Sequence, residues 1–263
     1  MNAILPGLCS VTFRELEPDA IIDLAAEAGI VGIEWGADVH VPVDELERAA
    51  AVAERSAASG VACASYGTYL GAREPIVDGE AVAAACRTAA ALGTTNLRVW
   101  AQLGVDPSVG PDERAVVTDG IRLAGDVAAE HDMTIGIEFH ARTLTETADS
   151  ALQLLADVDR ANVFSYWQPN FWTDNPHDVP GQIAEMQAIR PHLSHLHTFW
   201  WLARGERQPL ADGAAMWPTV FAETDATTNG WTDPRYAFLE FVEDDDPERF
   251  RRDAATLLGW LAA

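Results

Sequence analysis

The sequence contains no lysine: all 17 of its basic residues are arginine, set against 41 acidic residues and a formal net charge of −24. Schiff-base aldolases, pyridoxal-phosphate enzymes and Walker-type phosphate loops all need a lysine amine, so their chemistry is excluded. A strongly acidic chain without a basic patch also repels nucleic-acid backbones and anionic membrane surfaces. We therefore expect neither nucleic acid nor a membrane as a partner, and a phosphorylated substrate is disfavoured.

Cysteines and long apolar runs are also scarce. The chain has three scattered cysteines, too few for a disulfide framework or a zinc knuckle, and we expect them to fill the core. No apolar run approaches the roughly 18 residues of a membrane span. The opening MNAILPG lacks the basic flank and long apolar run of a signal peptide. The composition predicts a cytoplasmic protein, and its 48% of hydrophobic residues suffices for a sizeable core.

Eight strand-like runs recur along the 263 residues, and Ala-, Leu- and acid-rich stretches with helical spacing separate them. The runs are GLCSVTF (7–13), VGIEWG (31–36), ACASYGT (62–68), NLRVWA (96–101), TIGIEFH (134–140), FSYWQP (164–169), LSHLHTF (193–199) and YAFLEF (236–241). Such alternation implies parallel strands with right-handed crossovers. The count and length predict an α/β fold with one (β/α)8 TIM barrel domain over residues 1–263. An open doubly wound sheet is the alternative, but no GxGxxG follows the first run.

Polar side chains follow or end many of these runs. In a barrel, functional side chains gather at the carboxyl ends of the strands. The residues found there include Glu34, Arg98, Glu138, His140, Gln168, Asn170, His195, His197 and Glu240. Carboxylates, a histidine and an amide oxygen that meet in one lumen would suit Mn²⁺, Mg²⁺ or Co²⁺. For any one residue the alternative is structural, since an arginine such as Arg98 could neutralise Glu34 or Glu138.

Four motifs, IGIEFH, HLHTFWW, PLADGAAMWP and AFLEF, resemble the xylose isomerase-like barrels, and the resemblance runs nearly end to end. That family includes sugar epimerases, hydroxypyruvate isomerase and, distantly, endonuclease IV. The resemblance implies one divalent metal ion, Mn²⁺, Mg²⁺ or Co²⁺, bound by Glu138, Gln168, His197 and Glu240. Gln168 stands where the family usually has an aspartate. The loss of one negative charge is expected to weaken metal binding.

The resemblance also implies proton transfer next to a substrate carbonyl. The expected function is a metal-dependent isomerase or epimerase of a non-phosphorylated sugar or keto-sugar, working through a metal-bound enediolate with Glu138 and Glu240 as the acid/base pair. Two alternatives stay open: a metal-dependent lyase acting on an oxidised sugar, glycoside or cyclitol, and a sugar-binding barrel that has lost catalysis. Phe171 and Leu144 stand where tagatose-type epimerases carry a histidine and a glutamate, so a plain ketose 3-epimerase is disfavoured.

The remaining candidates lie around the predicted mouth of the barrel. His140 is the third predicted catalytic residue, as a proton shuttle or a ligand of a substrate hydroxyl. Six residues are predicted to bind the carbohydrate: Trp35, Arg98, Trp100, Asn170, Trp172 and Arg204. Aromatic faces stack on the C–H faces of sugars, although each ring could instead wedge a loop onto the barrel. Arg207 is the alternative to Arg204, and the resemblance leaves a homo-oligomer open.

Overall fold

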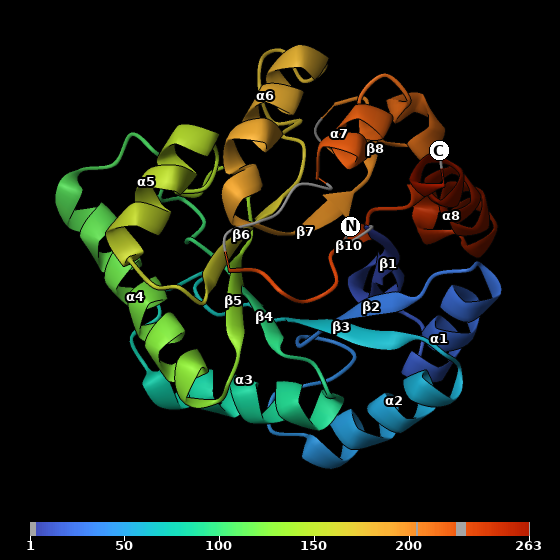
Figure 1. Ribbon diagram of the computed structural model, residues 1–263, viewed down its shortest axis with the longest axis horizontal. Coiled ribbons are helices and arrows are strands. Elements are labelled where there is room, and N and C mark those ends of the chain that lie inside the picture. The colour runs from blue at the N-terminus through green and yellow to red at the C-terminus, as the bar shows by residue number, and fades with distance from the viewer. Residues whose placement is uncertain (1–3, 204, 225–229, 263) are drawn as a thin grey trace.

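The strands close into a parallel barrel. The computed structural model describes residues 4–203, 205–224 and 230–262. Its barrel strands follow the order β1-β10-β7-β6-β5-β4-β3-β2, and helices ring them on the outside (Figure 1). The first strand, in blue, pairs with the last, in orange, with Leu5 opposite Tyr236. The (β/α)8 barrel predicted from the sequence is confirmed.

The barrel strands are short and almost wholly buried. Their bounds are β1 Leu5–Cys9, β2 Gly32–Gly36, β3 Ala62–Gly67, β4 Asn96–Val99, β5 Thr134–Ile137, β6 Val163–Trp167, β7 Leu193–Thr198 and β10 Tyr236–Leu239. The helices are α1 Pro18–Glu27, α2 Leu46–Ala58, α3 Gly79–Leu92, α4 Pro111–Glu130, α5 Ala148–Val158, α6 Val179–Ile189, α7 Trp217–Thr224 and α8 Pro247–Leu261. Strands covered on both faces are normally apolar throughout, so a charged side chain inside this barrel needs a reason.

The first strand is shorter than the sequence predicts. The run 7–13 is expected to be extended, but β1 ends at Cys9 and Ser10–Phe13 form a 3-10 helix. The Ser10 hydroxyl accepts a hydrogen bond from the Gly36 N–H at 2.9 Å and also lies 2.9 Å from His40 Nδ1. The Ser10 side chain thus takes the Gly36 N–H that a longer β1 would bond through its backbone, which explains the early end of the strand.

The long stretch after β7 has structure of its own. It holds an antiparallel pair of short strands, β8 (Trp200–Trp201) and β9 (Arg207–Gln208), followed by a 3-10 helix at Leu210–Gly213. Asp253 of α8 accepts a hydrogen bond from the Leu210 N–H at 2.9 Å. The stretch is therefore tied to the outer helix α8.

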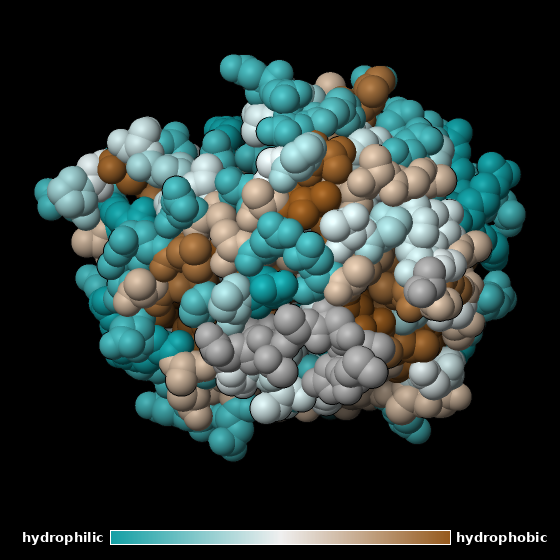
Figure 2. All heavy atoms as spheres, turned by 45° about the horizontal axis from the view of Figure 1, so that its top comes forward, coloured by the Kyte–Doolittle hydropathy of each residue, from teal (hydrophilic) through white to brown (hydrophobic). Residues whose placement is uncertain are grey.

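Hydrophilic residues gather along the outer rim of the molecule, where the helices lie, and apolar residues show in patches nearer the middle of the face in view (Figure 2). This is the distribution expected of amphipathic helices packed on a buried barrel. Within residues 4–203, 205–224 and 230–262, no helix combines the length and apolar character that a bilayer crossing requires.

Aromatic rings fill the inside of the barrel opposite strand positions that carry no side chain. A Cβ atom on Gly136 of β5 would lie 2.3 Å from the ring of Tyr166, and one on Gly32 would lie 2.3 Å from the ring of Tyr236. Real Cβ contacts are never that short, so each ring occupies the volume that its glycine leaves open. The two glycine–tyrosine pairs fix where these rings lie in the lumen.

Replacing Gly136 with alanine should therefore destabilise the fold by about 1–3 kcal/mol, because the new methyl group displaces the Tyr166 ring in a close-packed interior. Urea unfolding followed by circular dichroism would measure the loss. The matched control is Gly259→Ala in α8, where no atom lies within 4 Å of the added methyl group. A helical glycine replaced by alanine should gain roughly 0.5–1 kcal/mol. Equal effects of the two changes would contradict the packing argument.

Candidate functional site

Buried charged and polar side chains gather at the end of the barrel to which the strands point. Glu34 lies on β2, Arg98 on β4 and His197 on β7, while three others directly follow the ends of β5, β6 and β10: Glu138, Gln168 and Glu240. None of the six is more than 6% exposed. The carboxyl ends of the strands are where barrels of this topology carry their chemistry.

His197 lies at the centre of four residues that the sequence predicts to be metal ligands. Its Nδ1 atom is 2.9 Å from Gln168 Oε1, 3.5 Å from Glu240 Oε2 and 4.0 Å from Glu138 Oε1. The four donor-bearing tips thus meet around one point in the lumen.

The other edge of the His197 ring faces Glu34, for which the sequence analysis named neutralisation by Arg98 but no role as a metal ligand or in catalysis. His197 Nε2 lies 3.2 Å from Glu34 Oε1, and the Tyr166 hydroxyl donates to Glu34 Oε2 at 2.8 Å. Arg98 Nη1 lies 3.3 Å from Glu34 Oε1 and 3.1 Å from Glu138 Oε2. The sequence held a signal for Tyr166, because it lies two residues before Gln168 and so shares its strand face.

The cluster carries an excess of negative charge. Three carboxylates, those of Glu34, Glu138 and Glu240, face the Arg98 guanidinium, which leaves two negative charges in excess whenever His197 binds a metal as a neutral imidazole. Without a metal, burial would lower the pKa of His197, but attraction to Glu240 and Glu34 outweighs it and raises that pKa. Burial raises the pKa of Glu240 to about 7, and repulsion from Glu138 and Glu34 adds to the rise. Burial would also raise the pKa of Glu34, but attraction to Arg98 and His197 outweighs it and lowers that pKa.

The donor set fits a divalent cation. Neighbouring ligands of a hexacoordinate Mg²⁺ or Mn²⁺ lie about 3 Å apart and opposite ligands about 4.2 Å apart, because each bond is about 2.1 Å long. The three distances from His197 Nδ1 fall in or near that range, and one divalent ion would cancel the excess charge. Glu240 Oε2 is buried and has no hydrogen-bond partner within the described ranges, as expected of an atom that serves as a ligand.

Cys9 is the remaining donor close to this cluster. Donor atoms of Cys9, His197 and Glu240 all lie within 4.8 Å of one another, and the Cys9 thiol is 3.7 Å from Glu34 Oε1. Burial raises the pKa of the thiol well above its usual value, and repulsion from Glu34 and Glu240 raises it further. The thiol is therefore held protonated, and the oxygen and nitrogen donors are the better ligand set.

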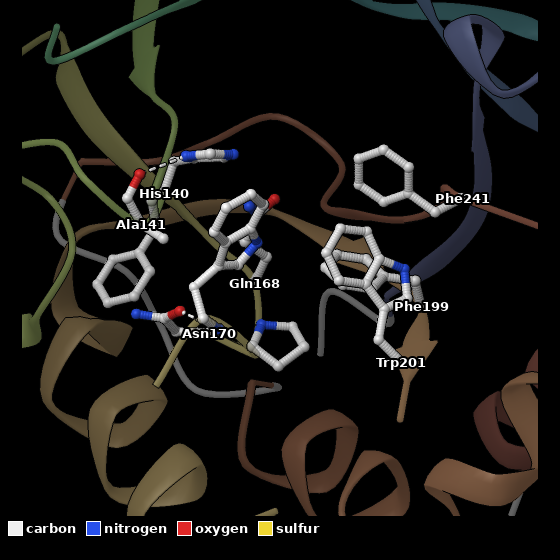
Figure 3. A pocket seen from close by; sticks show the side chains of 10 residues that line it. His140, Ala141, Gln168, Asn170, Phe199, Trp201 and Phe241 are labelled. Atoms are coloured by element: carbon white, nitrogen blue, oxygen red, sulfur yellow. Dashed lines mark hydrogen bonds between the residues drawn. The ribbon is translucent and has the colours of Figure 1, made fainter. Parts of the chain in front are cut away.

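A hollow beside the cluster contains His140. Its wall includes Gln168 and Asn170 together with the rings of Trp172, Phe199, Trp201 and Phe241. Figure 3 shows His140 and Asn170 on one side of the hollow, Phe199, Trp201 and Phe241 on the other, and Gln168 between them. His140 Nδ1 lies 2.7 Å from the Ala141 carbonyl oxygen, which can only accept a hydrogen bond. Nδ1 therefore carries a hydrogen, so in the neutral imidazole Nε2 is the nitrogen with the lone pair.

The six predicted substrate-binding residues differ in position. Asn170 and Trp172 line the hollow, and the Trp100 ring packs against His140 with 4.8 Å between ring centroids. Arg98 is 2% exposed inside the carboxylate cluster, where it binds protein groups. Arg204 lies outside the described residues.

The prediction for Trp35 is wrong. Glu34 points into the lumen, so the neighbouring Trp35 points to the helix side of β2, where it is completely buried and packs against His40. Arg207, the alternative to Arg204, donates to the Val242 carbonyl oxygen and to Asp245, so it anchors a loop.

His195 occupies the core. Its Nδ1 atom accepts a hydrogen bond from the Tyr236 backbone N–H at 3.1 Å, and aromatic rings surround it. Burial lowers the pKa of His195 to about 3, so it is a neutral histidine. Of the two histidines of β7, only His197 contacts the carboxylates of the site.

Comparison with known proteins places these features in context. Residues 22–256 match the sequence profile of the family described as xylose isomerase-like TIM barrel. A 3-dehydroshikimate dehydratase from Bacillus anthracis is 26% identical over 200 residues, which are 73% of this chain and 70% of that protein.

Solved structures share the fold. A "probable 3-DHS dehydratase" from Bacillus anthracis superposes with a TM-score of 0.79 at 19% identity, covering 97% of this chain and 99% of its own. A D-allulose 3-epimerase from Methylomonas sp. gives a TM-score of 0.71 at 16% identity and 99% coverage of both chains. A barrel protein from Mycobacterium smegmatis, solved in complex with magnesium, gives 0.70 at 15% identity, with 98% of this chain and 96% of that chain covered.

Proposed function

Because the chain belongs to the xylose isomerase-like TIM barrel family, we propose that it is a divalent-metal-dependent lyase that eliminates water or another β-leaving group from a cyclic hydroxyketone, such as a keto-sugar or keto-cyclitol. The proposal rests on the position of His140. Its Nδ1–H donates a hydrogen bond to the Ala141 carbonyl oxygen, and its ring lines the hollow beside Gln168. The site thus has a base that is separate from the four proposed metal ligands.

Two apolar residues favour elimination over epimerisation. Phe171 is 2% exposed and packs against Phe199, Trp200 and Trp201, with ring centroids 5.2–6.3 Å away, while Leu144 is completely buried. Sugar epimerases of the tagatose type place polar groups at these two positions to hold an open ketose. The similarity to a 3-dehydroshikimate dehydratase points in the same direction, because that enzyme is a lyase.

The residues Glu138, Gln168, His197 and Glu240 would bind the metal, which supplies a Lewis acid for the substrate carbonyl oxygen. His140 Nε2 takes the proton from the carbon next to that carbonyl. The electrons of the broken C–H bond form a C=C bond as the C–O bond to the β-carbon breaks. The His140 imidazolium then returns its proton to the departing hydroxide, which leaves as water. Arg98 holds Glu138 in place, and the rings of Phe199, Trp201 and Phe241 limit the access of bulk water.

An isomerase or epimerase is the second candidate. Glu138 and Glu240 both approach His197 Nδ1, so two carboxylates are available at one site for proton transfer. An enzyme of this type would exchange a C–H proton of the substrate with solvent, and the product would keep the chemical formula of the substrate. A sugar-binding barrel without catalysis would neither exchange the proton nor release a leaving group.

Incubation in deuterated water with Mn²⁺ and a panel of cyclic hydroxyketones and ketoses tests the three functions. The lyase predicts an unsaturated product, lighter than the substrate by one water or one other leaving group, that forms only when metal is present. A product of unchanged chemical formula carrying solvent deuterium would favour the isomerase or epimerase. If calorimetry detects no saturable binding of Mn²⁺, Co²⁺ or Mg²⁺, both metal-dependent enzymes are refuted.

A further inference from the structure

We propose that Glu34, itself held by Tyr166, is a positioning residue that fixes the orientation of His197, with Nε2–H bonded to Glu34 and Nδ1 turned toward Gln168 and Glu240. Only the consequence of this inference rests on the proposed function: a divalent metal would meet a His197 Nδ1 atom that is already oriented toward it. The orientation itself is read from the contacts of the protein.

The direction of the His197 hydrogen bond follows from its partner. Glu34 is deeply buried and approached by Arg98, and an ionised carboxylate can only accept hydrogen bonds. The 3.2 Å contact between His197 Nε2 and Glu34 Oε1 therefore has a hydrogen on Nε2. Nδ1 lies 2.9 Å from Gln168 Oε1, also an acceptor, so a hydrogen that Nδ1 shares with this oxygen in the metal-free protein is released when Nδ1 binds a metal. A histidine ligand whose far nitrogen donates to a carboxylate is fixed in both tautomer and ring angle.

Tyr166 fixes the other oxygen of the Glu34 carboxylate. Its one hydroxyl hydrogen goes to Glu34 Oε2 at 2.8 Å, and its oxygen lies 2.7 Å from Ser65 Oγ, which itself lies 3.1 Å from Asn96 Oδ1. Asn96 in turn donates through Nδ2 to Thr134 Oγ1 at 2.9 Å. This buried chain of hydrogen bonds links Glu34 to the polar groups of β3, β4 and β5, so the carboxylate cannot rotate without breaking it.

Two glycines make room for the arrangement. A Cβ atom on Gly136 would lie 2.3 Å from the Tyr166 ring, so any side chain there would displace the ring. A Cβ atom on Gly67 would lie 3.1 Å from both Glu34 Oε1 and Arg98 Nη2. The backbone of β3 and β5 thus leaves space for the Tyr166–Glu34 pair.

The orientation is tested first in metal-free protein. In ¹⁵N-labelled protein, the His197 Nε2–H should give a downfield proton resonance correlated with a protonated ring nitrogen, assigned by its loss in His197→Gln. Tyr166→Phe should shift this resonance strongly upfield, because Glu34 loses its second anchor, and Glu34→Leu should abolish it. Tyr236→Phe is the matched control, since Tyr236 also packs its ring against a strand glycine. It should leave the resonance in place.

The consequence is tested by Mn²⁺ titration of the same proteins. Loss of an outer-shell partner typically weakens metal binding about 10- to 100-fold, and Glu34→Gln and Tyr166→Phe should fall in that range while Tyr236→Phe matches the natural protein. An Nε2–H resonance unchanged in both Tyr166→Phe and Glu34→Leu would overturn the inference. So would Mn²⁺ affinities unchanged in both Glu34→Gln and Tyr166→Phe. A natural protein that shows the resonance but binds no metal would refute the proposed function, and the resonance would still support the orientation.

Discussion

Replacement of His140 with alanine is expected to lower turnover about 10²- to 10⁴-fold, which is the usual contribution of a positioned general base. The change removes the one base of the hollow that is separate from the proposed ligands. It leaves Glu138, Gln168, His197 and Glu240 in place, so the affinity for Mn²⁺ should stay the same. Steady-state kinetics and metal titration on the same preparation would check both parts.

The matched control for this change is His131→Ala. His131 caps the C-terminal end of α4, and among the residues that the structure describes no side-chain contact ties it to the site. Its loss should leave turnover unchanged. If His140→Ala keeps full activity, the proton is removed by another group, and the carboxylates Glu138 and Glu240 become the acid/base pair of an isomerase. Loss of Mn²⁺ affinity in His140→Ala would also contradict the separation of base and ligands.

Replacement of Glu240 with glutamine is expected to abolish turnover and to weaken Mn²⁺ binding by more than the roughly 10- to 100-fold loss typical of an outer-shell partner. The neutral amide removes one of the two excess negative charges that favour the cation. Calorimetric titration would measure the affinity, with Glu54→Gln on the exposed face of α2 as the control. Full retained activity would show that Glu240, the acid that follows β10, is misassigned.

The same variant should be more stable than the natural protein when metal is absent. The pKa of Glu240 rises from 4.5 to about 7 on folding, so the folded state holds this proton more tightly than the unfolded state does. The resulting stability is complete below pH 4.5 and is lost as the pH rises through 7. The loss is on the order of 3 kcal/mol, at about 1.4 kcal/mol for each pKa unit.

Urea unfolding with a chelator at pH 5 and pH 8 measures this effect. The natural protein should lose stability between the two values, and Glu240→Gln should lose less, since glutamine does not titrate. Mn²⁺ added at pH 8 should stabilise the natural protein and leave the variant almost unchanged. An equal pH dependence of the unfolding free energy in the two proteins would show that Glu240 is not the group whose pKa burial raises.

The fold could be predicted from the sequence because the same strand-and-helix pattern is repeated along the chain. Eight apolar runs separated by helical stretches admit few topologies, and each run supports the same answer. The local errors came from side-chain chemistry that periodicity does not contain. Strand β1 ended early because the Ser10 hydroxyl bonds the Gly36 backbone, a contact between residues 26 positions apart.

The candidate site was predicted in part. The residues at strand ends were found because a barrel directs them to one point, and the structure brings Glu138, Gln168, His197 and Glu240 together. Trp35 was misplaced because its face of β2 depends on the register, and a shift of one residue reverses the side. Tyr166 was missed because its partner Glu34 lies 132 positions away, and no local pattern connects two such residues.

The Arg98 guanidinium inside the carboxylate cluster affects how easily the barrel closes during folding. The folded barrel encloses three acids, and like charges confined in one place oppose closure of the barrel. The built-in cation between Glu34 and Glu138 relieves part of that repulsion. The barrel can therefore close without a bound ion.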